Sequence, residues 1–297
     1  MNLRTLRYFV TLVREGHFAR AAEQCGITQP TLSAALSAFE VEVGKQLVMR
    51  DRRYVGLTPE GEAILPWVRQ VLAAHEGMAH AIEAVEGLVR GEFRLGAIPA
   101  ATPAVGPFAR TLLEANPALT LAVRSLTSRE IERGLGAFEL DAGLTYLDHE
   151  PPGDVLAVPL YVERYVFVTA ETGFNVREDI DWAEVVSFPL CLLHQGMQNR
   201  RILDACLAAQ GLAITPRATA DSYVALLALV RSGTFATIMP DSYVAMIEGL
   251  GWARLLRITG AQPANRIGLI VPSRQPLNPL TGVALSAARE TLPLMHY

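Results

Sequence analysis

Residues 18–33 read Phe18-Ala19-Arg20-Ala21-Ala22-Glu23-Gln24-Cys25-Gly26-Ile27-Thr28-Gln29-Pro30-Thr31-Leu32-Ser33, and this stretch decides the fold of the N-terminal part. It predicts two short helices about a turn at Gly26. Thr28 stands where an N-cap belongs, and Pro30 falls in the first helical turn, where its missing N–H does no harm. The pattern indicates a helix-turn-helix, whose second helix can enter the major groove of DNA.

The second of these helices has one apolar and one polar face. Leu32, Leu36 and Phe39 recur at helical spacing and form the predicted inner face. Hydroxyl and amide side chains on or near the outer face are groups that contact DNA. The predicted DNA-binding residues of this helix and its cap are Thr28, Gln29, Pro30, Thr31, Ser33 and Ser37. Taken alone, the pattern also fits an ordinary helical hairpin with a solvated polar face.

A basic β-hairpin is predicted directly afterwards, over residues 48–58. Arg50, Arg52 and Arg53 gather at its tip, where they would lie against the phosphate backbone or a minor groove. Residues 1–58 hold eight basic and five acidic residues, a net charge of +3, whereas the whole chain carries −4. A basic N-terminal part on an acidic body favours local contact with nucleic acid. We therefore predict a winged helix-turn-helix DNA-binding domain over residues 1–58.

A long helix is predicted over residues 59–90. Apolar residues repeat there at alternating steps of four and three, with one histidine among them. The positions of this seam are Ile64, Val68, Val71, His75, Met78, Ile82, Val85 and Val89. A heptad repeat of this kind favours pairing with a second copy of the chain.

The remainder, residues 91–297, alternates strands with helices, which predicts an α/β domain. We expect two lobes, the first at about 91–161 and 268–297 and the second at about 162–267. Apolar strands at 164–170 and 266–271 would serve as crossovers between them. Further expected strands lie at 93–98, 119–126 and 140–144, with helices beginning at Thr102 and Ser128.

Several of these motifs resemble those of LysR-type transcription regulators. The resemblance rests on residues 18–23, 29–33 and 57–61 in the N-terminal part, and on 138–143 and 230–240 further on. It implies a dimerising linker helix and two lobes like those of type 2 periplasmic binding proteins, with an effector in the cleft. It also implies promoter DNA and RNA polymerase as partners, and assembly into a dimer of dimers.

The expected effector site lies at strand-to-helix turns, because ligands of open α/β sheets bind beyond the carboxyl ends of the strands. The predicted effector-binding residues are Ala100, Thr102, Thr127, Ser128, Tyr146, His194, Gln195, Gly196, Met197, Gln198 and Ser222. Hydroxyls and free N–H groups there favour a small anion, such as a carboxylate, although each hydroxyl could simply cap its own helix. Residues 128–148 and 194–201 resemble regulators found beside formate dehydrogenase genes, which implies formate or a similar small anion.

Composition and cysteine usage give further expectations. Cys25, Cys191 and Cys206 are widely spaced, which fits a reducing compartment and neither a disulfide framework nor a zinc site. The longest apolar run, residues 223–230, is too short to cross a membrane, and no secretory signal is visible. We expect a cytoplasmic protein that binds no membrane, metal or cofactor.

Three other functions are compatible with parts of the sequence. A two-lobed α/β enzyme is one, but the sequence shows no Walker loop, G-x-S-x-G or H-E-x-x-H motif, so we expect no enzyme. A secreted solute receptor would need an export signal and no basic DNA-binding head. The closest alternative is a redox-sensing regulator, because peroxide-sensing members of the resembled family use a cysteine pair in the region of Cys191 and Cys206. We favour a packing role for both, since no basic neighbour that would lower a thiol pKa is evident.

Overall fold

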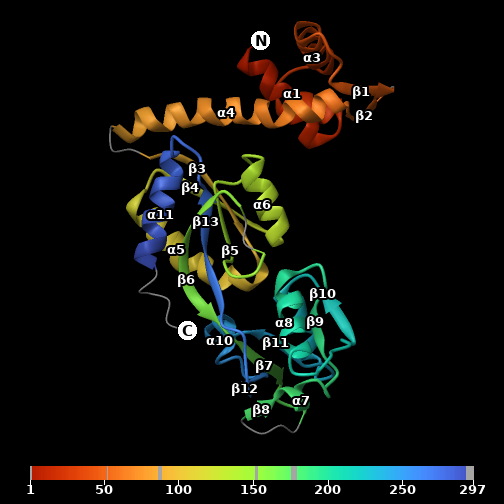
Figure 1. The fold of residues 1–297 in the computed structure, drawn as a ribbon, viewed down its shortest axis with the longest axis vertical. Helices are drawn as coiled ribbons and strands as arrows, with labels where there is room; N and C mark the ends of the chain where they lie inside the picture. The colour runs from red at the N-terminus through yellow and green to blue at the C-terminus, as the bar shows by residue number, and fades with distance from the viewer. Residues whose placement is uncertain (1, 52, 86–88, 151–152, 175–178, 292–297) are drawn as a thin grey trace. The chain divides into compact units, whose positions relative to one another are not determined.

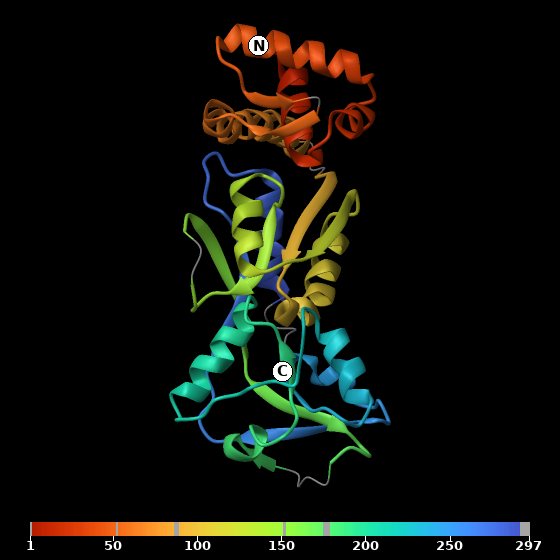
Figure 2. The ribbon, with the colours of Figure 1, turned by 90° about the vertical axis from the view of Figure 1, so that its right-hand side faces the viewer.

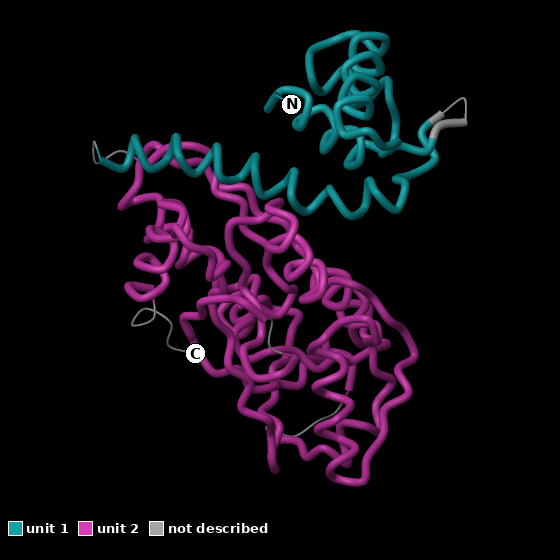
Figure 3. Tube along the Cα trace, turned by 45° about the horizontal axis from the view of Figure 1, so that its top comes forward, with its two compact units in different colours: residues 1–85 teal, residues 86–297 magenta. Residues whose placement is uncertain are grey.

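The structure is a computed structural model that describes residues 2–51, 53–85, 89–150, 153–174 and 179–291. The chain separates into two compact units, residues 1–85 and 86–297 (Figure 3). Each unit buries its own hydrophobic side chains.

The first unit contains a helix-turn-helix followed by a hairpin and a long helix (Figure 1). Its described elements are α1 (Leu3–Glu15), α2 (Phe18–Gln24), α3 (Gln29–Val43), β1 (Val48–Asp51), β2 (Arg53–Leu57) and α4 (Pro59–Val85). Gly26 has a φ of 65°, the left-handed conformation that glycine adopts without strain. Thr28 caps α3 by accepting a hydrogen bond from the N–H of Thr31 at 3.4 Å. The predicted helices, turn and hairpin are confirmed.

The core of this unit explains the orientation of α3. Leu32, Leu36 and Phe39 are fully buried, as predicted. Phe39 meets Phe9 of α1 edge to face, with ring centroids 6.0 Å apart. Because the apolar face is covered by α1, the opposite face of α3 is left to solvent.

The second unit is larger, and its elements follow the predicted alternation. In chain order they are β3 (Gly91–Ala97), η1 (Pro99–Ala101), α5 (Thr102–Ala115), β4 (Leu119–Ser125), α6 (Ser128–Gly136), β5 (Ala142–Tyr146), β6 (Val155–Glu163), β7 (Tyr165–Ala170), β8 (Asp179–Asp181), α7 (Trp182–Val185), β9 (Cys191–Leu193), α8 (Gln198–Ala208), β10 (Ala218–Ala220), α9 (Tyr223–Arg231), β11 (Thr237–Pro240), η2 (Asp241–Tyr243), α10 (Val244–Ile247), β12 (Ala253–Thr259), β13 (Asn265–Pro272) and α11 (Pro279–Thr291).

Two lobes make up this unit (Figure 2). Lobe I is built on a five-stranded sheet of order β4-β3-β5-β13-β6, in which β3 is parallel to β4 and β5. Lobe II is built on a four-stranded sheet of order β11-β7-β12-β8 and the parallel pair β9-β10. The chain crosses between the lobes from β6 to β7 and from β12 to β13. The two crossing segments lie side by side, because Glu163 at the end of β6 pairs with Asn265 at the start of β13.

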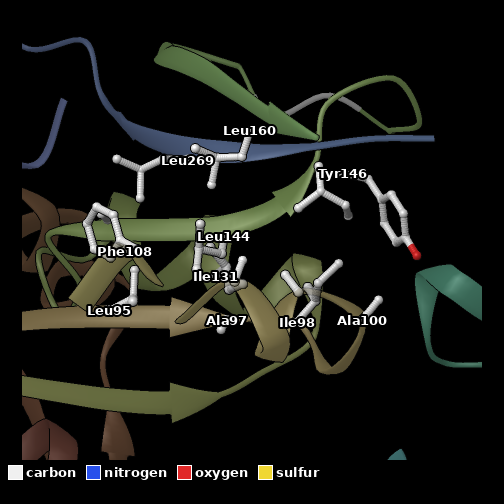
Figure 4. Close-up of a cluster of buried hydrophobic side chains, with 14 of the residues drawn as sticks. Leu95, Ala97, Ile98, Ala100, Phe108, Ile131, Leu144, Tyr146, Leu160 and Leu269 are labelled. Atoms are coloured by element: carbon white, nitrogen blue, oxygen red, sulfur yellow. The ribbon is translucent and has the colours of Figure 1, made fainter. Parts of the chain in front are cut away.

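The core of lobe I reaches to the boundary with lobe II. Side chains from β3, α5, α6, β5, β6 and β13 are buried together in it. Figure 4 shows Tyr146 at the edge of this cluster, with its hydroxyl directed away from the aliphatic side chains and toward α8. The hydroxyl of Tyr146 thus lies at the boundary between the two lobes.

One predicted strand boundary is wrong. The third strand is Ala142–Tyr146 and not 140–144, because Glu139 and Leu140 donate their N–H groups to the carbonyl of Gly134 and thereby close the end of α6. The long helix is not described beyond Val85. Val89, the last residue of the predicted seam, packs instead against the core of the second unit.

Candidate functional site

The first candidate surface is the outer face of α3 and its cap. Ser33 is half-buried, and the other five predicted residues are exposed, namely Thr28, Gln29, Pro30, Thr31 and Ser37. The hydroxyls of Thr28 and Thr31 lie 2.8 Å apart and share a hydrogen bond, so both residues also stabilise the helix terminus. Gln29 presents an exposed amide, a group that can bond both N6 and N7 of adenine.

The hairpin is fixed relative to α3 by a side chain that sequence reasoning missed. Oε1 of Glu40 accepts hydrogen bonds from the N–H groups of Leu47 at 2.9 Å and Val48 at 3.0 Å. On the other strand, the ring of Tyr54 meets that of Phe18 in α2 edge to face. A glutamate one turn before the end of a helix that leads into a hairpin is the signal that could have revealed this link.

The predicted basic tip of the hairpin falls partly outside the described residues. Arg50 and Arg53 belong to β1 and β2, but the structure does not describe their side chains. Arg52 lies outside the described residues altogether. The two strands of the hairpin are therefore established on either side of residue 52, and the contacts of its arginines stay predictions.

A close backbone approach explains the motif at residues 57–61. The Thr58 hydroxyl donates to the carbonyl of Gln46 at 2.7 Å and accepts from the N–H of Gly61 at 3.0 Å. A Cβ atom on Gly61 would lie 2.1 Å from the carbonyl oxygen of Leu47, so only glycine fits there. The motif therefore joins the start of α4 firmly to the hairpin.

Beyond its first turns, α4 carries an exposed apolar row. Leu65 and Val68 are buried in the core of the first unit. Further along the seam, the exposed fractions are 42% for Val71, 65% for Met78, 68% for Ile82 and 89% for Val85. An apolar row that the chain itself leaves exposed, here interrupted only by His75 among the described residues of the seam, is typical of an association surface.

A pocket lies between the lobes of the second unit. The space in it that a water-sized molecule can occupy is about 10 Å³, which is room for about one water molecule. Lobe I contributes Ile98, Pro99, Ala100, Thr127 and Ser128, and lobe II contributes Leu193, Met197, Gln198 and Asn199. Five predicted effector residues thus meet from both lobes, while Ile98, Pro99, Leu193 and Asn199 were missed. Asn199 directly follows the predicted run at 194–198. It lines the pocket because it lies on the buried side of α8.

The other predicted effector residues do not line this pocket. His194, Gln195 and Gly196 form the turn before α8, where Nδ1 of His194 accepts the N–H of Gly196 at 3.0 Å. Ser222 caps α9. Thr102 is exposed at the start of α5.

Tyr146 instead joins a buried polar cluster, which sequence reasoning also missed. The Tyr146 hydroxyl donates to Oε1 of Glu163 at 2.7 Å and accepts from Nδ2 of Asn199 at 2.6 Å. Burial raises the pKa of Glu163 to about 8, and the nearby charge of Asp241 adds to this effect. Because Asn199 also lines the pocket, the cluster connects the pocket wall to the crossing between the lobes.

Further bonds hold the lobes together beside the pocket. Nε2 of Gln198 donates to the carbonyl of His149. The guanidinium of Arg201 forms two bonds with the carboxylate of Glu150, at 2.7 and 3.1 Å. At the other side, the Tyr243 hydroxyl of lobe II donates to the carbonyl of Pro99 in lobe I at 2.6 Å.

Neither cysteine of lobe II lies in a setting that favours the thiolate. Cys191 is fully buried on β9, and this burial raises the pKa of its thiol to about 11. Burial also raises the thiol pKa of Cys206, which packs against the aromatic core of lobe II. In the arrangement seen here, both thiols are therefore weak nucleophiles.

The comparisons with known families follow the same division of the chain. Residues 3–62 match the model of the bacterial regulatory helix-turn-helix protein, lysR family, and residues 86–293 match the LysR substrate binding domain. The chain belongs to the LysR family. It is a LysR-type transcription regulator, and because the family consists of regulators, the enzyme alternative is wrong.

This LysR-type regulator is 32% identical, over 296 residues, to a protein of Streptomyces viridosporus named as a probable hydrogen peroxide-inducible genes activator. The match covers 98% of this chain and 92% of the relative. A full-length OxyR variant from Pseudomonas aeruginosa is 25% identical with a TM-score of 0.75, and the match covers 100% of this chain and 99% of that one. CbnR complexed with its target DNA is 22% identical with a TM-score of 0.69, over 98% of this chain and 100% of that one, and shares the fold.

Two findings concern other classes of site. No helix in the described part of the regulator has the length and hydropathy needed to span a membrane. Within the same residues, no group of three or more His, Cys, Asp or Glu side chains is placed to hold a metal ion.

Proposed function

We propose that this regulator binds promoter DNA through α3 and the β1-β2 hairpin. The observation that carries the proposal is the exposed polar face of α3, held against a hairpin whose orientation Glu40 fixes. Gln29, Thr31, Ser33 and Ser37 would face base edges, with Thr28 and Pro30 setting the start of the helix. Arg50, Arg52 and Arg53 would contact phosphates or a minor groove.

Pairing of two chains through α4 would present two α3 helices to the half-sites of a pseudopalindrome. The exposed row from Val71 to Val85 supports this. Contacts between second units would then join dimers into a tetramer that bends the promoter and alters contact with RNA polymerase. We place this activity in the cytoplasm, with residues 1–58, 59–90 and 91–297 as the DNA-binding, linker and effector-binding parts.

A small effector in the pocket between the lobes would control this arrangement. Ala100, Thr127, Ser128, Met197 and Gln198 support this position because they reach it from both lobes. An effector can shift the arrangement only by binding one state more tightly than the other. A small anion was the first expectation. Formate itself rests on a resemblance alone, and the named relatives point to peroxide instead.

A cysteine-based peroxide sensor is the second candidate, favoured by the names of those relatives. The raised thiol pKa values of Cys191 and Cys206 speak against it. The test is the Cys191→Ser, Cys206→Ser double variant. A DNA-binding response to hydrogen peroxide that survives in the variant would exclude this candidate, and a response lost only in the variant would establish it.

The proposed function is tested by fluorescence anisotropy with the full chain. The two probes are the duplex upstream of its own gene and a shuffled duplex of equal length and composition. We expect at least a hundredfold preference for the upstream duplex at physiological salt, since specific sites are typically bound ~10³–10⁷-fold more tightly. Equal affinity for both duplexes, with and without small metabolites, would contradict the proposal.

A further inference from the structure

Glu163 holds a buried carboxyl group at the crossing between the lobes. It ends β6, and its strand partner Asn265 begins β13, where the chain returns to lobe I. Oε1 accepts hydrogen bonds from the hydroxyl of Tyr146 at 2.7 Å and from Nδ2 of Asn199 at 3.3 Å. Oε2 is buried and has no hydrogen-bond partner in the described part of the chain. Only one oxygen of this carboxyl is therefore satisfied.

Groups from both lobes enclose this carboxyl. Its two donors come from β5 of lobe I and α8 of lobe II. Burial raises the pKa of the hydroxyls of Tyr165, Tyr223 and Tyr243 of lobe II, and a negative charge on Glu163 would raise each of them further. Tyr161, two residues before Glu163 on β6, acts on Tyr223 in the same sense. Because the enclosure is shared, water reaches the carboxyl when the lobes separate at this crossing.

The charged groups around Glu163 disfavour its ionised form. Burial raises the pKa of its carboxyl to about 8, and the negative charge of Asp241 in η2 adds to this effect. Within the described residues, no basic side chain forms an ion pair with Glu163. The basic side chains on neighbouring elements act on other groups, namely His149 on Asn265, Arg200 on Asp204, Arg201 on Glu150 and Arg164 on Asp241.

Ionisation of this carboxyl has opposite effects on the two arrangements of the lobes. In the arrangement seen, the charge would lose its hydration without gaining a counter-ion, which is costly. Once water reaches the group, its pKa returns to the ordinary value of 4.5. Protonation therefore favours the arrangement seen, and loss of the proton favours a separated one.

We propose that Glu163 is a proton-operated latch between the two lobes. While the carboxyl is neutral, it holds α8 against the end of β5. When it passes its proton to water, the lobes separate at the crossing and the carboxylate is hydrated. Asn199 carries this change to the pocket, because it donates to both Tyr146 and Glu163 and also lines the pocket. That the arrangement of the lobes governs DNA binding rests on the proposed function.

Single-molecule FRET within the full chain measures the separation of the lobes. Dyes are attached through Glu132→Cys in lobe I and Val224→Cys in lobe II, both at exposed positions. Cys25 and Cys206 are replaced by Ser, whereas Cys191 is fully buried and stays. Labelled chains are mixed with an excess of unlabelled chains, so that only distances within one chain are measured. Between pH 5 and pH 8 the ratio of the low-pH to the high-pH conformation should fall about tenfold per pH unit, because separation releases one proton.

Two variants and a matched control assign the response. Glu163→Gln keeps an acceptor for Tyr146 and cannot ionise, so the dependence on pH should disappear. Asp241→Asn removes a charge that raises the pKa of Glu163, so the upper end of the response should move to lower pH. The control Glu150→Gln removes another carboxylate that joins the lobes, whose pKa Arg201 holds below its ordinary value. It should loosen the lobes at every pH and leave the slope unchanged.

The proposal is overturned if the ratio of conformations in the wild type does not change with pH. It is equally overturned if Glu163→Gln responds as the wild type does, or if Asp241→Asn leaves the response at the same pH. Failure with an intact preference for the upstream duplex overturns this inference alone, whereas loss of that preference in the wild type overturns the proposed function.

Discussion

The hydroxyl of Tyr146 donates a 2.7 Å hydrogen bond to Oε1 of Glu163, and both side chains are fully buried. Tyr146 ends β5 in lobe I, and Glu163 ends β6 where the chain crosses into lobe II. Because Asn199 of α8 donates to both groups, one carboxyl connects the two lobes. Its protonation state therefore bears on the stability of their contact.

The first prediction concerns pH. Burial raises the pKa of Glu163 from 4.5 to about 8 in the folded chain, so its contribution to stability is fully present below 4.5 and is lost as the pH rises toward 8. Glu163→Gln removes this titration. We expect the Tm of wild type to fall more steeply than that of the variant between pH 5 and 8, as measured by calorimetry. Parallel curves would show that Glu163 does not titrate in this range.

The second prediction concerns the hairpin. Replacing Arg52 and Arg53 together with Ala should weaken binding to every duplex, and the slope of log affinity against log salt should fall by about one for each lost phosphate contact. Arg217→Ala, which alters an exposed arginine of the second unit, is the control and should leave the slope unchanged. An unaltered slope in the double variant would remove the hairpin from the DNA interface.

The third prediction separates base contact from general binding. Gln29→Ala removes an exposed amide at the start of α3, and should reduce preference for the upstream duplex by about 1–3 kcal/mol while affinity for shuffled DNA stays the same. Gln24→Ala, at an exposed position at the end of α2, is the matched control. Competition anisotropy measures both affinities. An equal loss on both duplexes would mean that Gln29 does not contact a base.

The fourth prediction concerns the seam of α4. Ile82→Asp places a charge in the exposed apolar row and should weaken dimerisation at least tenfold, since burying one isoleucine stabilises by about 1.5–3 kcal/mol. Gln70→Asp, at an exposed position off the seam, should have no effect. Sedimentation velocity measures the dimer fraction. An unchanged fraction in Ile82→Asp would place the dimer interface elsewhere.

Local pattern was sufficient for much of the fold. The cap at Thr28, the turn at Gly26 and the buried face of α3 follow from side-chain chemistry within a few residues, as does the capping box at Thr127. The heptad spacing in α4 equally located an exposed apolar row. These features depend on neighbours close in sequence, so the sequence alone determined them.

Tertiary structure decided the content of the pocket and its surroundings. Thr102 and Tyr146 lie near strand ends just as Thr127 does, yet Thr102 is exposed at the start of α5 and Tyr146 hydrogen-bonds Glu163. The buried carboxyl of Glu163 and the unpartnered oxygen of Gln198 arise from groups far apart in the chain. The spacing of residues along the sequence cannot predict these contacts, because burial and hydrogen bonding depend on which strands and helices pack together in space.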